Sequence, residues 1–194
     1  MGEIFKIQRL YQSGLSQADV AAKLSYSVGK VVYLMNKHGI KKRNRSDATY
    51  LKRNPAGDPF KIKEKLKSSD YFLYGLGLGL FLGEGNKKDK NSVRLGNSDP
   101  CLVKKFIEFL IIICGIKRKK LRFGLQIFTD SNPSKVLKYW QEKINFGQEY
   151  FLKPIITEGR GKGSYKEKTK TGVLTVYFHN KKLHDFIISS IQKL

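Results

Sequence analysis

The feature that most constrains the fold is an apolar segment from Asp70 to Gly85 that contains the run YGLGLGLFLGEG. Apolar side chains at positions 71–73, 76, 80 and 81 predict one continuous buried helix with Asp70 as its N-cap. Each glycine inside a helix costs roughly 1 kcal/mol, so the packing must offset that cost. Gly75, Gly79 and Gly83 recur every four residues and therefore share one face. The segment predicts a helix that another helix approaches to backbone contact.

The same segment excludes one common role of glycine-rich sequences. It has neither the GxGxxG spacing nor the GK[ST] ending of phosphate-binding loops. It ends instead in one acid, Glu84, which NKKDK follows after Gly85. A single carboxylate in a basic neighbourhood is the feature that the function has to explain.

The charge of the chain predicts a polyanionic partner. Among 194 residues, 38 are Lys or Arg and 16 are Asp or Glu, which gives a formal net charge of +22. A compact body with this charge repels itself unless a polyanion binds it, and nucleic acid is the partner that we expect. The sequence shows no signal peptide, and its other long apolar run, FLIIICGI, is too short to span a bilayer. We expect a cytoplasmic, nucleoid-associated protein without a membrane or small-molecule partner.

The chain divides into two basic modules. The segment RNPAGDPF combines proline and glycine and is typical of a linker. We place a DNA-binding domain at residues 1–53, a linker at 54–69 and a second domain at 70–194.

The first module has the pattern of two short helices. Ser16 and Ser27 are suited to cap helices whose inward faces carry Val20, Ala21 and Leu24, and then Val31, Leu34 and Met35. Only SYS separates the two helices, a spacing that resembles the helix-turn-helix of bacterial DNA-binding proteins. A plain helical bundle remains the alternative. The residues expected to contact DNA are Lys30, Tyr33 and Lys37 on the second helix and Lys41, Lys42, Arg43 and Arg45 in the arm KKRNR.

In the second module, GLGLFLGEG resembles the signature helix of the LAGLIDADG homing endonucleases. Gly79, Leu80, Gly83, Glu84 and Gly85 match the Gly, Leu, small, acidic and Gly positions of that motif, whereas Leu82 stands where the motif has its first Asp. The predicted elements follow in the order of the family: strands at 92–97 and 121–128, a helix at 134–144, strands at 150–156 and 172–178, and a helix at 181–194. The resemblance covers residues 70–194.

The resemblance implies an α+β fold, the αββαββα saddle of this family. Here one extra helix, at 100–116, lies between the first two strands, and the small all-α helix-turn-helix domain precedes the saddle. In the family two signature helices pack through their glycines, and the sheets straddle DNA. With one motif in this chain, the resemblance implies a homodimer on a near-palindromic site. The dimer helix would use Gly75, Gly79, Leu80 and Gly83.

The resemblance also implies a magnesium-dependent reaction. Glu84 matches the acid that helps to bind Mg²⁺ at the scissile phosphate, with Gly83 beside it. Lys181 matches a lysine that the family places near that phosphate, with Lys182 as its competitor. A solvated lysine at a helix start is the equal alternative.

Strand alternation assigns the faces of the predicted sheet. Leu121, Phe123, Leu125 and Ile127 are expected to face the helices. The residues expected on the DNA side are Arg94, Arg122, Gln126, Lys153, Thr175 and Tyr177, together with Ser92, Gly124 and Phe128. The loop TEGRGKGSYKEKTKTG adds Arg160 and Lys162 as phosphate contacts.

Two functions fit these patterns. The first is a site-specific, metal-dependent endonuclease for double-stranded DNA. The second is a transcription regulator that binds DNA through a LAGLIDADG-like domain without cutting it. A maturase role on RNA is a third and more distant hypothesis.

Overall fold

The computed structural model describes residues 2–129, 131–158 and 171–193. They form two compact units that divide between Pro59 and Phe60. This division falls inside the predicted linker, residues 54–69. Phe60 and Ile62 pack against the core of the second unit, so the later part of that segment belongs to the second unit. None of the helices in the described ranges combines the length and the apolar character needed to cross a membrane.

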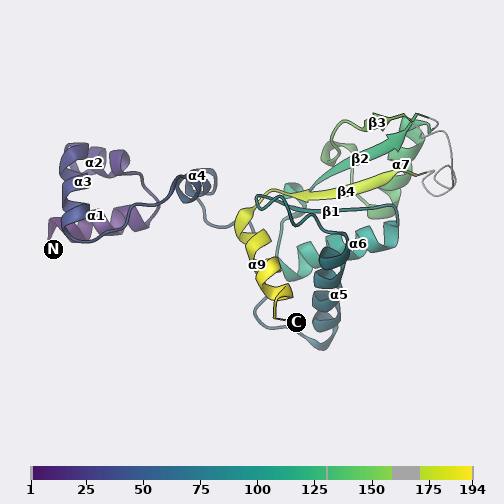
Figure 1. The fold of residues 1–194 in the computed structure, drawn as a ribbon, viewed down its shortest axis with the longest axis horizontal. Coiled ribbons are helices and arrows are strands. Elements are labelled where there is room, and N and C mark those ends of the chain that lie inside the picture. Colours follow the sequence, from purple (N-terminus) through teal and green to yellow (C-terminus); the bar gives the residue numbers. More distant parts are fainter. Residues whose placement is uncertain (1, 130, 159–170, 194) are drawn as a thin grey trace. The chain divides into compact units, whose positions relative to one another are not determined.

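The first unit contains four helices (Figure 1). They are α1 (Glu3–Gln12), α2 (Gln17–Leu24), α3 (Val28–Lys37) and α4 (Arg45–Arg53). The two predicted caps are confirmed. The Ser16 Oγ accepts the Asp19 N–H at 3.1 Å, and the Ser27 Oγ accepts the Lys30 N–H at 3.1 Å. These caps satisfy main-chain donors at the two helix starts and fix the short turn between them.

The core of the first unit joins α2 and α3 to a helix that the sequence analysis did not assign. Its buried residues are Ile7, Tyr11, Val20, Ala21, Val31 and Met35. Ile7 and Tyr11 come from α1. The predicted inward faces of α2 and α3 are therefore covered by α1.

The second unit has a four-stranded sheet and four α-helices among its described residues. In chain order these elements are α5 (Ser68–Glu84), β1 (Val93–Asn97), α6 (Pro100–Glu108), a π-helical turn (Phe109–Ile113), β2 (Arg122–Phe128), α7 (Pro133–Ile144), β3 (Ile155–Thr157), β4 (Val173–Phe178) and α9 (Lys181–Ile191). Short 3-10 turns occupy Arg118–Lys120 and Gln148–Tyr150. With its separate helices and mixed sheet, the chain belongs to the α+β class.

The sheet has the order β1-β4-β2-β3. Strand β4 runs antiparallel to both β1 and β2, whereas β3 runs parallel to β2. The strand predicted at 150–156 forms only in its last part, because Pro154 has no N–H to donate and Tyr150 lies in a 3-10 turn. The extra helix lies between β1 and β2, as the sequence analysis expects.

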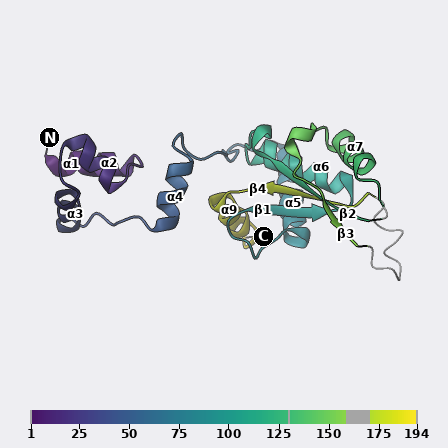
Figure 2. The same cartoon turned by 90° about the horizontal axis from the view of Figure 1, so that it is seen from above.

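Helices cover one face of this sheet. In Figure 1, α5, α6 and α9 lie below the strands, and from above the strands lie in front of α5 and α6 (Figure 2). Leu121, just before β2, and Phe123, Leu125 and Ile127 within it are buried on the helix side, which confirms their predicted alternation. No helix among the described residues covers the opposite face of the strands.

Helix α5 begins two residues before the predicted cap. Asp70 is not its N-cap but the third helical residue, and its carboxylate accepts the Lys67 N–H at 2.7 Å. The Lys63 ammonium lies 2.7 Å from the same carboxylate oxygen. The hydrogen bonds from Lys63 and from the Lys67 main chain hold the pKa of Asp70 below its usual range.

The glycines of α5 fall into two groups. A Cβ on Gly77 would lie 2.2 Å from the Phe109 Cγ, so Gly77 allows Phe109 to pack directly on the helix backbone. A Cβ on Gly75, Gly79 or Gly83 would meet nothing within 4 Å. Gly77 therefore packs against the core of its own chain, whereas the stripe of Gly75, Gly79 and Gly83 has no close neighbour there.

This difference predicts opposite effects for two substitutions in one helix. Gly77→Ala should destabilise the second unit by about 1–3 kcal/mol, because Phe109 cannot give way without repacking. Gly79→Ala should stabilise the folded monomer by up to about 1 kcal/mol, because alanine favours the helix and its Cβ meets no neighbour in its own chain. Denaturant unfolding followed by the fluorescence of Trp140, the single tryptophan, measures both. Equal effects of the two changes would contradict this packing.

Candidate nucleic-acid interface

The open sheet face collects predicted DNA-facing residues from three strands. Arg94 of β1 is paired with Tyr177 of β4, and Tyr177 is paired with Arg122 of β2. The next row holds Gly96, Thr175 and Gly124. Two arginines thus flank one tyrosine, and beside them the sheet carries almost no side chain.

The Tyr177 side chain lies across this glycine row. A Cβ on Gly124 would lie 2.8 Å from Cε2 of Tyr177 and 3.1 Å from its hydroxyl oxygen. The Tyr177 ring also lies beside that of His179, with centroids 6.1 Å apart and planes 21° apart. His179 is exposed and was given no role from the sequence, although its spacing of two residues from Tyr177 places both on one face.

Arg94 is held in place at one end of the first row. Its Nη2 lies 2.5 Å from the Asp89 Oδ2, and its Nε donates to the Ser92 Oγ at 2.7 Å. Ser92, predicted on the DNA side, is instead fully buried, because its hydroxyl is used to orient Arg94 and Asp89. The guanidinium is therefore ordered before any ligand binds.

Asp89 is the anchor of this cluster. Its Oδ1 accepts the Asn91 N–H at 3.0 Å, and its Oδ2 accepts the Ser92 hydroxyl at 2.9 Å. These two hydrogen bonds, followed by the charges of Arg94 and His179, outweigh partial burial and hold the pKa of Asp89 below its usual range.

The remaining predicted sheet residues are less tightly arranged. The Arg122 Nη1 donates to the carbonyls of Lys119 and Leu121 at 2.8 and 2.7 Å, which leaves the rest of its guanidinium available. Gln126 and Lys153 are exposed, and Gln126 pairs with Ile155 of the edge strand. Arg160 and Lys162 lie outside the described residues.

Glu84 lies where α5 meets the sheet. It is the last residue of α5, and the following residue, Gly85, forms a β-bridge with Leu95. The Asn86 N–H then donates to the Arg94 carbonyl at 2.9 Å. The helix end is thereby joined to the outer edge of β1, and Glu84 is brought to the edge of the basic face.

Glu84 offers one available carboxylate. It is exposed and forms no ion pair within the described ranges. Those ranges contain no group of three or more His, Cys, Asp or Glu side chains that could hold a metal. Mg²⁺ binds through few protein carboxylates and takes other oxygens from phosphate and water. The Glu84 carboxylate therefore fits such an ion if further ligands come from phosphate, water or a second chain, and Gly83 beside it is exposed.

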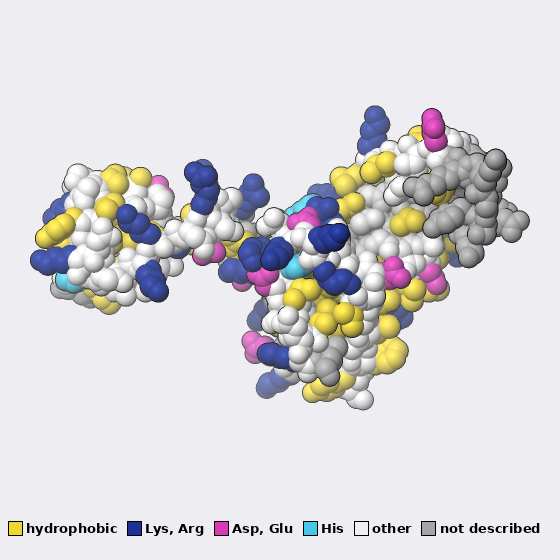
Figure 3. Space-filling model, viewed as in Figure 1, with side chains coloured by type: hydrophobic (Ala, Val, Ile, Leu, Met, Phe, Trp, Pro, Cys, Tyr) yellow, Lys and Arg dark blue, Asp and Glu magenta, His cyan; other side chains and the backbone are white. Residues whose placement is uncertain are grey.

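Two lysines near these groups have partners. The Lys87 ammonium donates to the Leu82 carbonyl at the end of α5, and Lys181 forms an ion pair with Asp185 one turn along α9. Both lysines remain exposed. In the space-filling view, Lys and Arg side chains gather with His side chains where β4 ends and α9 begins (Figure 3).

In the first unit, α3 presents the predicted residues to solvent. Tyr33 is 61% exposed, and Lys37 is exposed beside it. The Lys30 ammonium lies 3.0 Å from the Glu3 carboxylate and 3.8 Å from the centre of the Tyr26 ring. Lys30 thus reaches DNA only in competition with Glu3. Lys41, Lys42 and Arg45 are exposed.

Arg43 was predicted to bind phosphate as part of the arm KKRNR, but its guanidinium is bound within the first unit. Its guanidinium donates to the carbonyls of Tyr11, Gly14 and Leu15 at 2.5, 3.1 and 2.6 Å. It also lies over the Tyr11 ring, with Cζ 3.9 Å from the centroid. The residue closes the turn between α1 and α2, because charge-assisted hydrogen bonds to these carbonyls satisfy the helix end. It is not free to grip phosphate.

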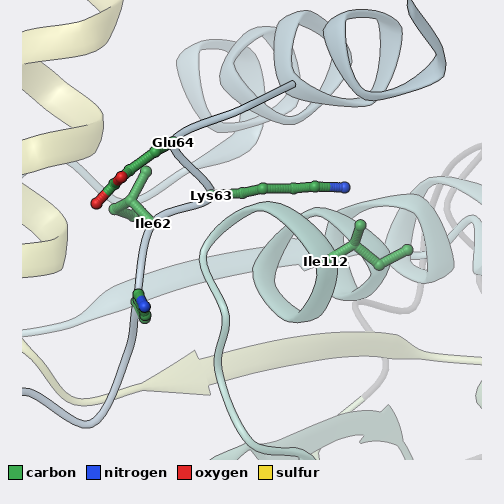
Figure 4. A pocket seen from close by; sticks show the side chains of 5 residues that line it. Ile62, Lys63, Glu64 and Ile112 are labelled. Atoms are coloured by element: carbon green, nitrogen blue, oxygen red, sulfur yellow. The ribbon is translucent and has the colours of Figure 1, made fainter. Parts of the chain in front are cut away.

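A hollow of about 340 Å³ lies elsewhere in the second unit, away from the open sheet face and Glu84. Lys61, Ile62, Lys63, Glu64 and Ile112 line it. In Figure 4, the side chains of Lys63 and Glu64 point in different directions. Lys63 already pairs with Asp70, so the hollow gathers no set of groups for chemistry.

Comparisons with protein-family models, curated proteins and solved structures found no match to this chain. The LAGLIDADG resemblance and the roles that it implies therefore stay predictions from the sequence.

The Asp89 cluster predicts a pH dependence with a definite sign. Because folding lowers the pKa of Asp89, its contribution to stability is present above about pH 4, the unfolded value, and is lost as the pH falls through the lower folded value. Asp89→Asn should be less stable than the wild type at pH 7, and the difference should shrink in acid. The free energies of unfolding of Asp89→Asn and of the wild type, measured at pH 7 and again in acid below about pH 4, test this. A difference that stays constant with pH would contradict the role of the carboxylate.

Proposed function

We propose that this protein is a site-specific endonuclease that binds double-stranded DNA as a homodimer and hydrolyses it with a divalent metal. One observation carries the proposal: the open glycine face of α5 ends in an available carboxylate at the edge of a basic sheet face. The net charge of +22 supports a nucleic-acid partner.

The face of α5 supports the dimer. Phe72 and Leu82 are 70% and 51% exposed on the same side as the stripe Gly75, Gly79 and Gly83. Large apolar side chains beside a stripe of glycine form a ridge and a groove that two copies of one helix can share about a two-fold axis. Leu80, also predicted for this interface, is half-buried and packs against the core of its own chain.

The dimer has a direct test. Gly79→Leu should convert the dimer to a monomer in sedimentation velocity, because its side chain fills the groove from a position where an added Cβ meets nothing within 4 Å in its own chain. Lys138→Leu, at an exposed position on α7, is the control and should leave the dimer intact. A Gly79→Leu variant that remains dimeric would place the interface elsewhere.

The chemistry that we assign to the chain is modest. Bound Mg²⁺ would polarise the phosphate and lower the pKa of the attacking water. The Glu84 carboxylate, with the Gly83 carbonyl, would hold that ion at the helix end. Lys181 is exposed and forms an ion pair with Asp185. Its ammonium would leave Asp185, contact the phosphate and stabilise the charge that develops there. Arg94 and Arg122 would hold the duplex backbone.

Cleavage is tested on DNA that the protein has selected. Sites are enriched from a random duplex library by binding without a divalent metal, and Mg²⁺ is then added. Wild-type protein should cut the enriched site, and Glu84→Gln should bind it while cutting at least about a hundredfold more slowly, since it loses the only ligand charge that we assign. A wild-type protein that binds but never nicks the site would exclude the endonuclease.

That outcome would support a second function, a DNA-binding transcription regulator that does not cut. Two observations favour it: Lys87 places its ammonium at the end of α5, and Lys181 is engaged by Asp185. In a regulator, Glu84 faces phosphate without a metal, so Glu84→Gln would bind DNA as tightly as the wild type or more tightly.

A further inference from the structure

The side chains of Tyr177 and His179 form an aromatic surface on the open sheet face. Their planes differ by 21°, and their centroids are 6.1 Å apart, the arrangement of offset-stacked rings. Because the rings are offset, each leaves part of its face uncovered by the other. Tyr177 is half-buried and His179 is exposed, so this surface is open to a ligand.

Gly124 gives the Tyr177 ring its position. The outer end of the ring lies over the Gly124 backbone, where a Cβ would come within 2.8 Å of Cε2. A side chain that stood straight out from β4 would not reach the neighbouring strand in this way. The outer end of the ring thus leans over the neighbouring strand β2.

Cations border this surface on two sides. The Arg94 Cζ lies 5.3 Å from the Tyr177 centroid, compared with 3.9 Å for Arg43 over Tyr11. Arg94 therefore makes a long cation–π contact with Tyr177, and Asp89 and Ser92 hold its guanidinium there. Its Nη1 has no partner among the described residues and can donate to a phosphate. Arg122 lies beside Tyr177 on the other strand.

Aromatic rings with guanidinium groups beside them match an unpaired nucleotide. In a duplex, the faces of a base are hidden by its neighbours in the stack, so duplex contacts are made with base edges and phosphates. An unpaired base exposes its face and stacks on Tyr or His, whatever its sequence. The adjoining phosphates then need cations near the ring.

We propose that Tyr177 and His179 stack against an unpaired nucleobase of DNA or RNA, with Arg94 and Arg122 binding its adjoining phosphates. The proposal rests on the nucleic-acid binding proposed above and adds a single-stranded ligand to it. Gly124 and Asp89 have positioning roles in this proposal. Gly124 leaves room for the Tyr177 ring, and Asp89 orients the Arg94 guanidinium.

The test compares fluorescein-labelled oligothymidylate, oligouridylate and a random-sequence duplex by anisotropy with the full-length chain. Tyr177→Ala should weaken binding of both single strands by roughly tenfold or more, since the base loses the ring on which it stacks. Its affinity for the duplex should change by less than about threefold. Tyr177→Phe, which keeps the ring, should bind like the wild type, and Gly124→Ala should lose several-fold by displacing the ring.

The remaining controls separate the possible failures. Trp140 fluorescence during unfolding checks that each variant is folded. If Tyr177→Ala binds single strands like the wild type while duplex binding persists, the stacking site is wrong and the proposed duplex function stands. An equal loss for duplex and single strands would also overturn the stacking site. If the wild type binds none of the three probes, both proposals fail. A wild-type preference for the thymidylate or the uridylate strand identifies DNA or RNA as the source of the base.

Discussion

The contact between Gly77 and Phe109 determines how the second unit is arranged. Helix α5 is apolar around most of its circumference, so its hydrophobic pattern alone does not choose a buried face. At Gly77 the aromatic ring of Phe109, in the π-helical turn, approaches the helix backbone. This contact turns the other glycine stripe outward, and the bridge from Gly85 to Leu95 then fixes the end of the helix against β1. The position of Glu84 and the open face of α5 both follow from it.

Local chemistry made some of this fold predictable. The caps at Ser16 and Ser27 depend on residues within three positions, and the buried alternation of β2 depends on a period of two. These features need no knowledge of distant parts of the chain. The position of the extra helix followed from the same local patterns, whereas the α+β class was implied by the family resemblance.

Features that depend on distant partners were not predictable in this way. From the sequence, Arg43 is expected to be a free cation. In the structure its guanidinium binds three carbonyls and the Tyr11 ring at the end of α1, a helix that was not predicted. Ser92 has the parity of an exposed residue, but it is buried against Asp89 and Arg94. The role of Gly124 appears only when the register places Tyr177 on the next strand. The resemblance to a family named a metal ligand and a lysine, but it could not show that Lys181 would be paired with Asp185.

The division at Pro59 and Phe60 leaves each unit with a hydrophobic core of its own. If both units bind one nucleic acid, the first to bind raises the effective concentration of the second at the neighbouring site. Tight binding then requires neither unit to bind tightly alone, and the spacing between two half-sites becomes a determinant of selectivity. A change in the length of the segment that joins the two cores would alter which targets are bound, without altering a single contact in either unit.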